Sequence, residues 1–314
     1  MGYDLLDRAE GFRCARPIQR RWDRSMAKAF LERVRLEQPT VIVATHFFPA
    51  VALAEAKQFG WLTSRVVVVV TDLFPHRLWL TPEADAFVVG SEEVKAVCQQ
   101  RGIAEARIHP LGIPIAKAFR HSPDKGMVRE RLRLDPARQT LLIVSGGEGM
   151  GPMSQLVRHL VTLEAVHPKH LQLLVVCGSN VRLRETLDRV AAASTMPMRV
   201  FGFVDTMPEL MGVSDLLLTK PGGLTVMEAL AMGLPMIFFN AIPGQERFNA
   251  DYVIRHGAGL NAAHPAQVKE TVLRLLDHPA QLDAMRSRAL SLAKPTAAQQ
   301  LVETLIAPAT HGTA

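Results

Sequence analysis

The residues best suited to bind a phosphate group are TKPGGLTVME, at positions 219–228. A short apolar run precedes them, and the residues after the glycine pair have a helical pattern. Unpaired N–H groups and the dipole at the start of a helix favour a diphosphate. Glu228 lies about one turn inside this helix, with its side chain tilted back toward the N-terminus, where it could accept from two ribose hydroxyls. The alternative is an ordinary Gly-Gly turn beside an exposed helix glutamate.

Two further segments that follow apolar runs carry suitable chemistry. SGGEGMG, at residues 145–151, precedes a helical pattern, and its glycines allow the main chain to approach a ligand. PGQERFN, at residues 243–249, offers donors and acceptors that match sugar hydroxyls. The alternatives are a tight turn for the first segment and a polar helix cap for the second.

Short apolar runs predict the strands that position these segments, because strands buried on both faces of a parallel sheet have continuous apolar sequences. We predict strands at residues 40–45, 65–71, 85–90, 107–110, 140–144, 171–177, 198–203, 215–219 and 234–239. Helical patterns occupy residues 152–167, 182–194, 225–232, 245–256 and much of 266–306. A polar segment at residues 121–139, with a short helix inside it, divides the two series. The alternation predicts two doubly wound α/β domains facing across a cleft, with ligands at the carboxyl ends of the strands.

Composition excludes several classes of protein. With 48% hydrophobic and 21% charged residues, the 314-residue chain is not disordered, collagen-like or a coiled coil. The longest nearly apolar stretch, residues 229–239, is too short to span a membrane, and no signal peptide is visible. Cys14, Cys98 and Cys177 suit neither a disulfide framework nor a zinc site, so a reducing cytoplasm is expected.

The net charge of +6 is concentrated near the N-terminus, where eight basic residues lie between Arg13 and Arg35. A helix from Pro17 to about Leu36 is predicted there, with Arg20, Arg24 and Lys28 on one face. This face is either a solvated helix surface or a contact with anionic lipid headgroups.

TKPGGLTVMEALAMGLPMIFFNAIPGQERFNADY, at residues 219–252, resembles the nucleotide-sugar domain of the monogalactosyldiacylglycerol synthases and processive diacylglycerol glucosyltransferases. TDLFPHRLW, at residues 71–79, is similar to their TD-x-x-x-H-x-x-W element, and LGIPI, at residues 111–115, to their G-I-P-I turn. The likeness extends in order from about Val41 to Pro295. It implies the GT-B fold, with two Rossmann-like domains.

The resemblance implies a role for each matching position. Glu228 would hold the ribose of a UDP-sugar, and the main chain of Gly222, Gly223, Leu224 and Thr225 its diphosphate. The turn from Gly202 to Met207 would receive the uracil, with the main chain of Val204 contacting the edge of the base. Gln245, Glu246 and Asn249 would face the sugar, and Gly146 and Gly147 would line the cleft near the phosphates. No Asp-x-Asp motif is present, consistent with transfer without a metal or other cofactor in GT-B enzymes.

One element of the family is not found before Val41, namely a strand followed by a glycine-rich turn that ends in Gly-His. We therefore expect an incomplete first domain. His46, Asp72 and His76, each placed after a predicted strand, are the candidates for the general base. The alternatives are a packed histidine for His46, a structural cap for Asp72 and a scaffold role for His76.

The resemblance implies transfer of galactose or glucose from a UDP-sugar to the sn-3 hydroxyl of diacylglycerol. We expect a truncated acceptor and membrane-facing domain at residues 1–118, a linker at 119–139 and a nucleotide-sugar domain with C-terminal helices at 140–314. The expected partners are diacylglycerol and an anionic membrane surface, with no nucleic acid, and the expected location is the inner face of the cell membrane. The alternatives are a GT-B transferase for another lipid-linked acceptor and a non-catalytic UDP-sugar-binding remnant.

Overall fold

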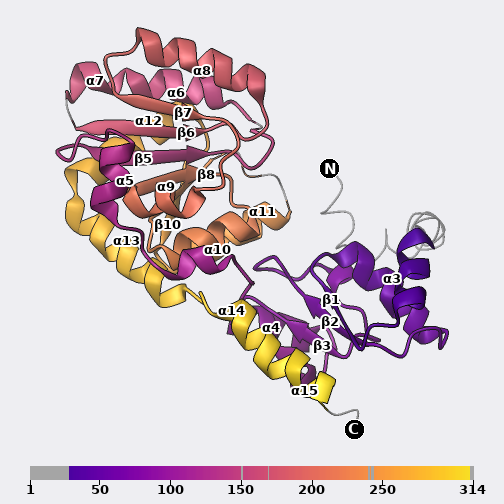
Figure 1. Cartoon of the computed structure of the whole chain (residues 1–314). Coiled ribbons are helices and arrows are strands. Elements are labelled where there is room, and N and C mark those ends of the chain that lie inside the picture. The colour runs from indigo at the N-terminus through magenta and orange to yellow at the C-terminus, as the bar shows by residue number, and fades with distance from the viewer. Residues whose placement is uncertain (1–27, 150, 169, 240, 242–243, 312–314) are drawn as a thin grey trace. The chain divides into compact units, whose positions relative to one another are not determined.

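The computed structural model describes residues 28–149, 151–168, 170–239, 241 and 244–311, which form two compact units (Figure 1). Unit 1 takes the described residues of Met1–Ile115, Pro243–Phe248 and Lys294–Ala314. Unit 2 takes those of Ala116–Ile242 and Asn249–Ala293. This division differs from the predicted boundaries, because the last helices of the chain belong to unit 1 and the predicted linker belongs to unit 2.

A parallel four-stranded sheet forms the centre of unit 1, in the order β1-β2-β3-β4. The strands are β1 (Val41–Ala44), β2 (Arg65–Val69), β3 (Ala86–Val88) and β4 (Ile108–His109). All four confirm predicted strands. β2 and β3 are almost completely buried, as their continuous apolar sequences require.

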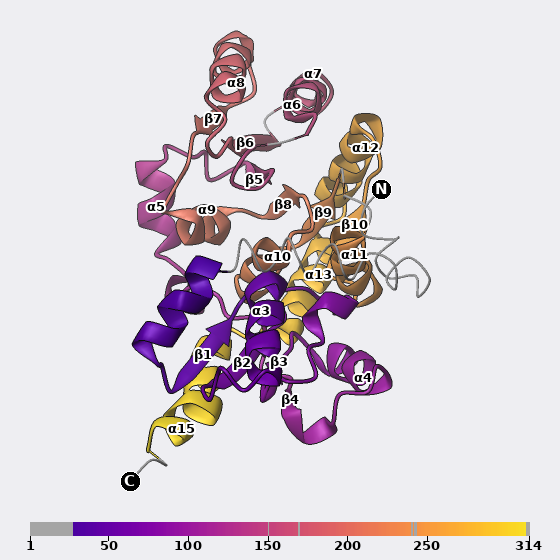
Figure 2. The same cartoon turned by 90° about the vertical axis from the view of Figure 1, so that its right-hand side faces the viewer.

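Helices cover both faces of this sheet (Figures 1 and 2). On one face, Val66 and Val68 pack in a cluster with Leu53 of α3 (Phe47–Gln58) and Val94 of α4 (Glu92–Gln100). On the other face, Val67 and Val69 pack with Leu301 and Leu305 of the C-terminal helices. This packing explains why the end of the chain joins unit 1. The remaining helical segments of the unit are residues 28–37, η1 (Arg77–Trp79), η2 (Glu105–Arg107), α14 (Ala297–Leu301), η4 (Val302–Ile306, π-helical) and α15 (Ala307–His311).

Unit 2 contains a parallel six-stranded sheet in the order β10-β9-β8-β5-β6-β7. Its strands are β5 (Gln139–Val144), β6 (Leu171–Val176), β7 (Met198–Phe201), β8 (Leu216–Thr219), β9 (Met236–Phe238) and β10 (Gly259–Asn261). The first five confirm predicted strands. β10 was not predicted, because this three-residue strand has one large apolar side chain, Leu260, and is recognised only by its pairing with β9.

The strand order of unit 2 reverses between β5 and β8. From β5 the chain moves outward through β6 and β7, then returns to β8 on the other side of β5 and continues to β9 and β10. Such a reversal is a topological switch point, where the loops after the two central strands leave a crevice for a ligand. The loops that follow β5 and β8 are the two glycine-rich segments identified in the sequence.

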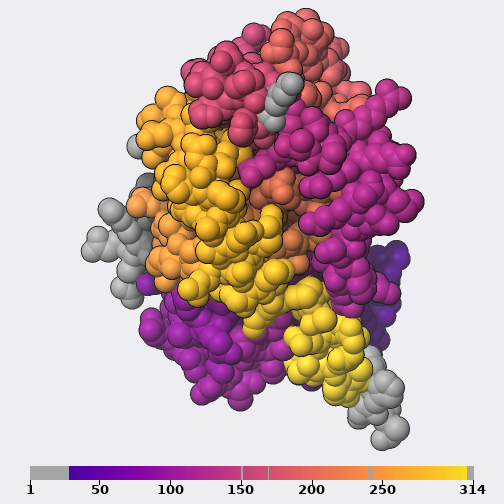
Figure 3. Space-filling view, turned by 90° about the vertical axis from the view of Figure 1, so that its left-hand side faces the viewer, coloured from indigo at the N-terminus to yellow at the C-terminus, as the bar shows by residue number. Residues whose placement is uncertain are grey.

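The helices of unit 2 enclose this sheet. Leu141 and Ile143 of β5 share a cluster with residues of α6 (Met153–Val161), α8 (Val181–Ala193) and α12 (Pro265–Asp277). Helices α12 and α13 (Pro279–Leu292), orange to yellow, form part of the surface in Figure 3. The segment at residues 116–139 is held by α5, which packs against α9, and by Pro123, which lies beside Gly212. The helices are η3 (Lys117–Arg120), α5 (Lys125–Arg131), α6 (Met153–Val161), α7 (Leu163–Val166), α8 (Val181–Ala193), α9 (Met207–Val213), α10 (Gly223–Ala231), α11 (Gln245–Arg255, begun in unit 1), α12 (Pro265–Asp277) and α13 (Pro279–Leu292).

Only part of the predicted basic helix lies among the described residues. Residues 28–37 are helical, and Lys28 is exposed at the start of this range. Arg20 and Arg24 lie outside the described residues. Within the part of the chain that the structure describes, no helix has the length and apolar composition needed to cross a bilayer.

Candidate functional site

The glycine-rich loop after β5 packs main chain against main chain with the loop after β6. A Cβ atom on Gly178 would lie 2.1 Å from the carbonyl oxygen of Gly147, and one on Gly149 would lie 2.2 Å from that of Cys177. The Ser179 N–H donates to the Gly147 carbonyl oxygen at 2.8 Å. Gly149 and Gly178 also have positive φ, at +57° and +58°. These two glycines are therefore required by the fold itself.

Gly147 and Gly222 have a different environment. A Cβ atom on either residue would meet no heavy atom of the described residues within 4 Å. Internal packing therefore does not require glycine at these positions. Both lie in loops at the switch point, where an absent side chain leaves the main chain open to a ligand.

The N-terminus of α10 is built to receive an anion. Its N-cap is Gly222, no side chain caps the first turn, and no acidic residue lies in that turn. The Gly222 N–H donates to the carbonyl oxygen of Lys220 at 2.9 Å, and Asn249 Nδ2 donates to that of Pro221 at 3.1 Å. The Asn249 side chain, expected at the sugar, is buried, and its hydrogen bond helps to shape this loop.

Glu228 lies farther along α10 and is half-buried. No hydrogen bond to its carboxylate is found among the described residues, and burial raises the pKa of Glu228 to about 7. A carboxylate that has lost water without gaining a donor is suited to accept hydrogen bonds from a ligand.

The turn between β7 and α9, where the uracil was expected, has the required main-chain groups. The N–H and carbonyl groups of Val204 have no hydrogen-bond partner among the described residues. The neighbouring Phe203 is 72% exposed, and Met207 begins α9. Arg184 of α8 covers Gly202, with its Nη1 atom 3.4 Å from the position of a Cβ there.

The candidate bases lie in unit 1, after β1 and β2. His46 is the N-cap of α3 and accepts from the Phe48 N–H through Nδ1 at 3.2 Å. His76 packs edge-on against Phe47, with ring centroids 4.9 Å apart. Asp72 accepts a hydrogen bond from Gln245 Nε2 at 2.7 Å. His46 therefore caps α3, and Gln245, expected at the sugar, donates to the Asp72 carboxylate.

Lys220 was not among the predicted ligands. It lies between β8 and α10, and its Cε atom is 3.9 Å from the position of a Cβ on Gly146. Its side chain therefore joins the two loops at the switch point. The sequence pattern that could have indicated Lys220 is a cation that follows a buried strand and stands shortly before a glycine pair.

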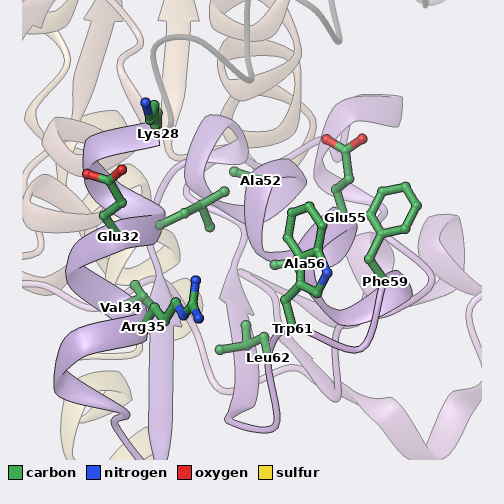
Figure 4. A pocket seen from close by; sticks show the side chains of 11 residues that line it. Lys28, Glu32, Val34, Arg35, Ala52, Glu55, Ala56, Phe59, Trp61 and Leu62 are labelled. Carbon is green, nitrogen blue, oxygen red and sulfur yellow. The ribbon is translucent and has the colours of Figure 1, made fainter.

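An apolar groove in unit 1 lies outside these loops (Figure 4). It has a volume of about 710 Å³ and separates residues 28–35 from the second half of α3. Phe59 and Trp61 stack at its edge with centroids 5.3 Å apart, and their side chains are 53% and 73% exposed. Lys28, predicted to contact lipid headgroups, also lines it.

Other reactive groups are few in the described part of the chain. Burial raises the pKa of both Cys98 and Cys177 to about 11, so these thiols stay protonated at neutral pH. The described residues contain no group of three or more His, Cys, Asp or Glu side chains that could hold a metal ion.

Comparison with known proteins identifies the family. A model described as monogalactosyldiacylglycerol (MGDG) synthase matches residues 11–115, and one for the C-terminal domain of glycosyltransferase family 28 matches residues 140–301. A processive diacylglycerol beta-glucosyltransferase of Bacillus cereus is 31% identical over 275 residues, covering 87% of this chain and 69% of the relative. The chain belongs to the family of MGDG synthases and diacylglycerol glucosyltransferases. The corresponding enzyme of Bacillus cytotoxicus is also 31% identical, over 86% of this chain and 68% of the relative.

Solved structures show the fold of this diacylglycerol glycosyltransferase family member. MurG of Acinetobacter baumannii superposes with a TM-score of 0.65 at 16% identity, over 87% of this chain and 75% of MurG. MnaA of S. aureus, solved with UDP, gives a TM-score of 0.71 at 13% identity, over 90% and 79% of the two chains. The predicted GT-B fold, with two Rossmann-like sheets, is confirmed.

Proposed function

We propose that this protein transfers a hexose, galactose or glucose, from a UDP-sugar to the sn-3 hydroxyl of diacylglycerol. The observation that carries the proposal is the switch point of unit 2, where an uncapped helix N-terminus lies near two open glycines and is followed by the half-buried Glu228. Family membership supports the same activity.

Each part of the donor fits a group of unit 2. The N–H groups at the start of α10 suit the diphosphate, and the Glu228 carboxylate suits two ribose hydroxyls. The unpaired main chain of Val204 suits the edge of uracil. Since UDP gains negative charge as it leaves, the helix-end donors stabilise it where the charge develops, and we propose that no resident cofactor is needed.

The chemistry requires one proton acceptor. The sn-3 hydroxyl oxygen forms a bond to C1 of the hexose, the bond from C1 to the β-phosphate oxygen breaks, and its electron pair stays on UDP. The hydroxyl proton passes to a base. Asp72 suits this role better than His46, because Gln245 holds the Asp72 carboxylate while His46 Nδ1 is occupied by the cap of α3.

The decisive test is titration of the purified chain with UDP, followed by incubation with UDP-galactose or UDP-glucose and diacylglycerol vesicles. We expect UDP binding and a hexosyl-diacylglycerol product detected by mass spectrometry. UDP binding without product would contradict transferase activity while leaving the donor site intact. Absence of UDP binding by the folded chain would contradict the donor site as well.

We also propose that unit 1 meets an anionic membrane surface on the cytoplasmic side. The exposed Phe59–Trp61 pair suits the interface between headgroups and acyl chains, where aromatic rings are favoured. Lys28 on the same groove and the basic residues before it suit anionic headgroups, each contributing about 1 kcal/mol.

Vesicle sedimentation tests this surface. Replacing Arg20, Arg24 and Lys28 by Glu is expected to abolish salt-sensitive binding to phosphatidylglycerol vesicles, and Trp61→Ser to weaken the binding that remains at high salt. The control replaces the exposed Arg182 and Arg189 of unit 2 by Glu and is expected to bind as the wild type does. Unchanged binding by both unit 1 variants would refute the proposed surface.

A further inference from the structure

We propose that Lys220 contacts the diphosphate of the bound UDP-sugar and stabilises the UDP leaving group by its charge. This inference rests on the proposed function and assigns a further residue to the donor site. Lys220 directly follows β8, whose last residue, Thr219, pairs with Val144 at the end of β5. Lys220 and Ser145 therefore leave the sheet side by side, at the switch point.

The main chain around Lys220 is firmly held. The carbonyl oxygen of Lys220 accepts from Thr219 Oγ1 at 3.0 Å and from the Gly222 N–H at 2.9 Å. The next carbonyl, that of Pro221, accepts from the buried Asn249 side chain. The fixed backbone sets the direction in which the Lys220 side chain leaves the loop.

The side chain extends from β8 toward the loop after β5. Its Cε atom lies 3.9 Å from the position of a Cβ on Gly146, and Gly147 and Gly222 leave open space on the two loops that Lys220 joins. A diphosphate seated on the start of α10 would therefore have the Nζ ammonium group within reach.

The balance of charge supports this assignment. The N-terminus of a helix carries about half an elementary positive charge, whereas UDP gains about one negative charge as the bond to the hexose breaks. Lys220 is the one cation of the sequence TKPGGLTVME, and no acidic residue lies in the first turn of α10. The full positive charge of Lys220 offsets the part of the negative charge on the leaving UDP that the helix end alone does not balance. The Lys220 side chain acts here as a point charge.

The test compares UDP with uridine, which lacks the phosphates, by calorimetric titration. For Lys220→Gln we expect the Kd of UDP to rise roughly 10- to 100-fold, the effect of losing a hydrogen bond to a charged group, with the Kd of uridine unchanged. The UDP affinity of this variant should also depend less steeply on NaCl concentration. Lys220→Arg should retain most of the UDP affinity, because the positive charge is kept.

Lys125→Gln serves as the matched control, because Lys125 is an exposed lysine of unit 2 outside the donor loops. It is expected to bind both ligands as the wild type does. With a UDP-sugar, Lys220→Gln should lower kcat more than it raises KM, because the charge develops in the transition state.

Three results of these titrations distinguish a direct contact between Lys220 and the diphosphate from a displaced loop and from the absence of a donor site. Equal losses of UDP and uridine affinity in Lys220→Gln would show that the loop has moved and would overturn the proposal. Unchanged UDP affinity in the same variant would also overturn it, while leaving the proposed function standing. Failure of the wild-type chain to bind UDP would instead refute the proposed function.

Discussion

Replacement of Glu228 by Gln is expected to weaken UDP binding by about 1–3 kcal/mol, or roughly 5- to 150-fold in Kd. The ionised carboxylate can accept from both ribose hydroxyls, whereas the amide offers a single oxygen acceptor and places an NH2 group beside a hydroxyl. Calorimetric titration of both proteins with UDP and with uridine measures the change. The loss should be similar for the two ligands, because both carry the ribose.

This prediction includes a defined dependence on pH. Because the pKa of Glu228 is raised to about 7, uridine should bind more tightly as pH rises through 7, as the carboxylate becomes ionised. Glu228→Gln should show no such rise. Uridine is the ligand of choice, since the terminal phosphate of UDP itself titrates near pH 6.

The same raised pKa has the opposite effect on stability. The folded protein binds more protons at Glu228 than the unfolded chain between the ordinary value of 4.5 and about 7, so this group's contribution to stability falls as pH rises through that range. The stability of Glu228→Gln relative to the wild type should therefore increase as pH is raised from 5 to 8, as measured by thermal unfolding.

If Glu228→Gln is folded and binds uridine with wild-type affinity at pH 8, the assignment of Glu228 to the ribose is refuted.

Replacement of Gly178 by Ala is expected to lower the free energy of unfolding by about 2–4 kcal/mol and to weaken UDP binding as well. The Cβ would lie 2.1 Å from the Gly147 carbonyl oxygen, and the positive φ of +58° adds strain. The loop after β5 must then shift, which displaces Gly146 and Gly147 from the switch point. Urea unfolding and UDP titration measure the two effects.

Gly147→Ala is the matched counterpart in the same loop. A Cβ there meets nothing within 4 Å, and φ is not positive, so we expect unchanged stability. If the donor phosphates approach this main chain, UDP affinity should nevertheless fall. Wild-type UDP affinity in Gly147→Ala would place the ligand elsewhere, and wild-type stability in Gly178→Ala would contradict the contact described between the two loops.

Much of the fold was predictable because local sequence and final environment agree. Runs such as RVVVVVT at residues 65–71 are continuously apolar, and a parallel sheet buried on both faces requires this pattern. β10 was missed for the converse reason, since its identity depends on pairing with β9 rather than on its own residues. The helices at residues 297–311 were expected in the nucleotide-sugar domain but pack in unit 1, because an amphipathic pattern shows that a helix packs without showing its partner.

For the site, residue types made residues 219–228 a candidate for a diphosphate and ribose and residues 145–151 a candidate for close approach of main chain, with ordinary turns as the alternative, and the family resemblance favoured the donor roles. They could not separate the glycines required by packing, Gly149 and Gly178, from those that leave open space, Gly147 and Gly222. Nor could they show that Gln245 donates to Asp72 or that Asn249 is buried beneath the loop after β8.

The sequence by itself determined the family, the order of strands and helices along the chain, and the segments that we propose bind the donor. Only the tertiary structure decided which strands are neighbours, and hence that β5 and β8 bring residues 145–149 and 219–225 together and place Lys220 beside Gly146. The physical reason is that composition and periodicity reflect the environment of each residue, buried or exposed, whereas contacts between distant segments depend on how the whole sheet is ordered.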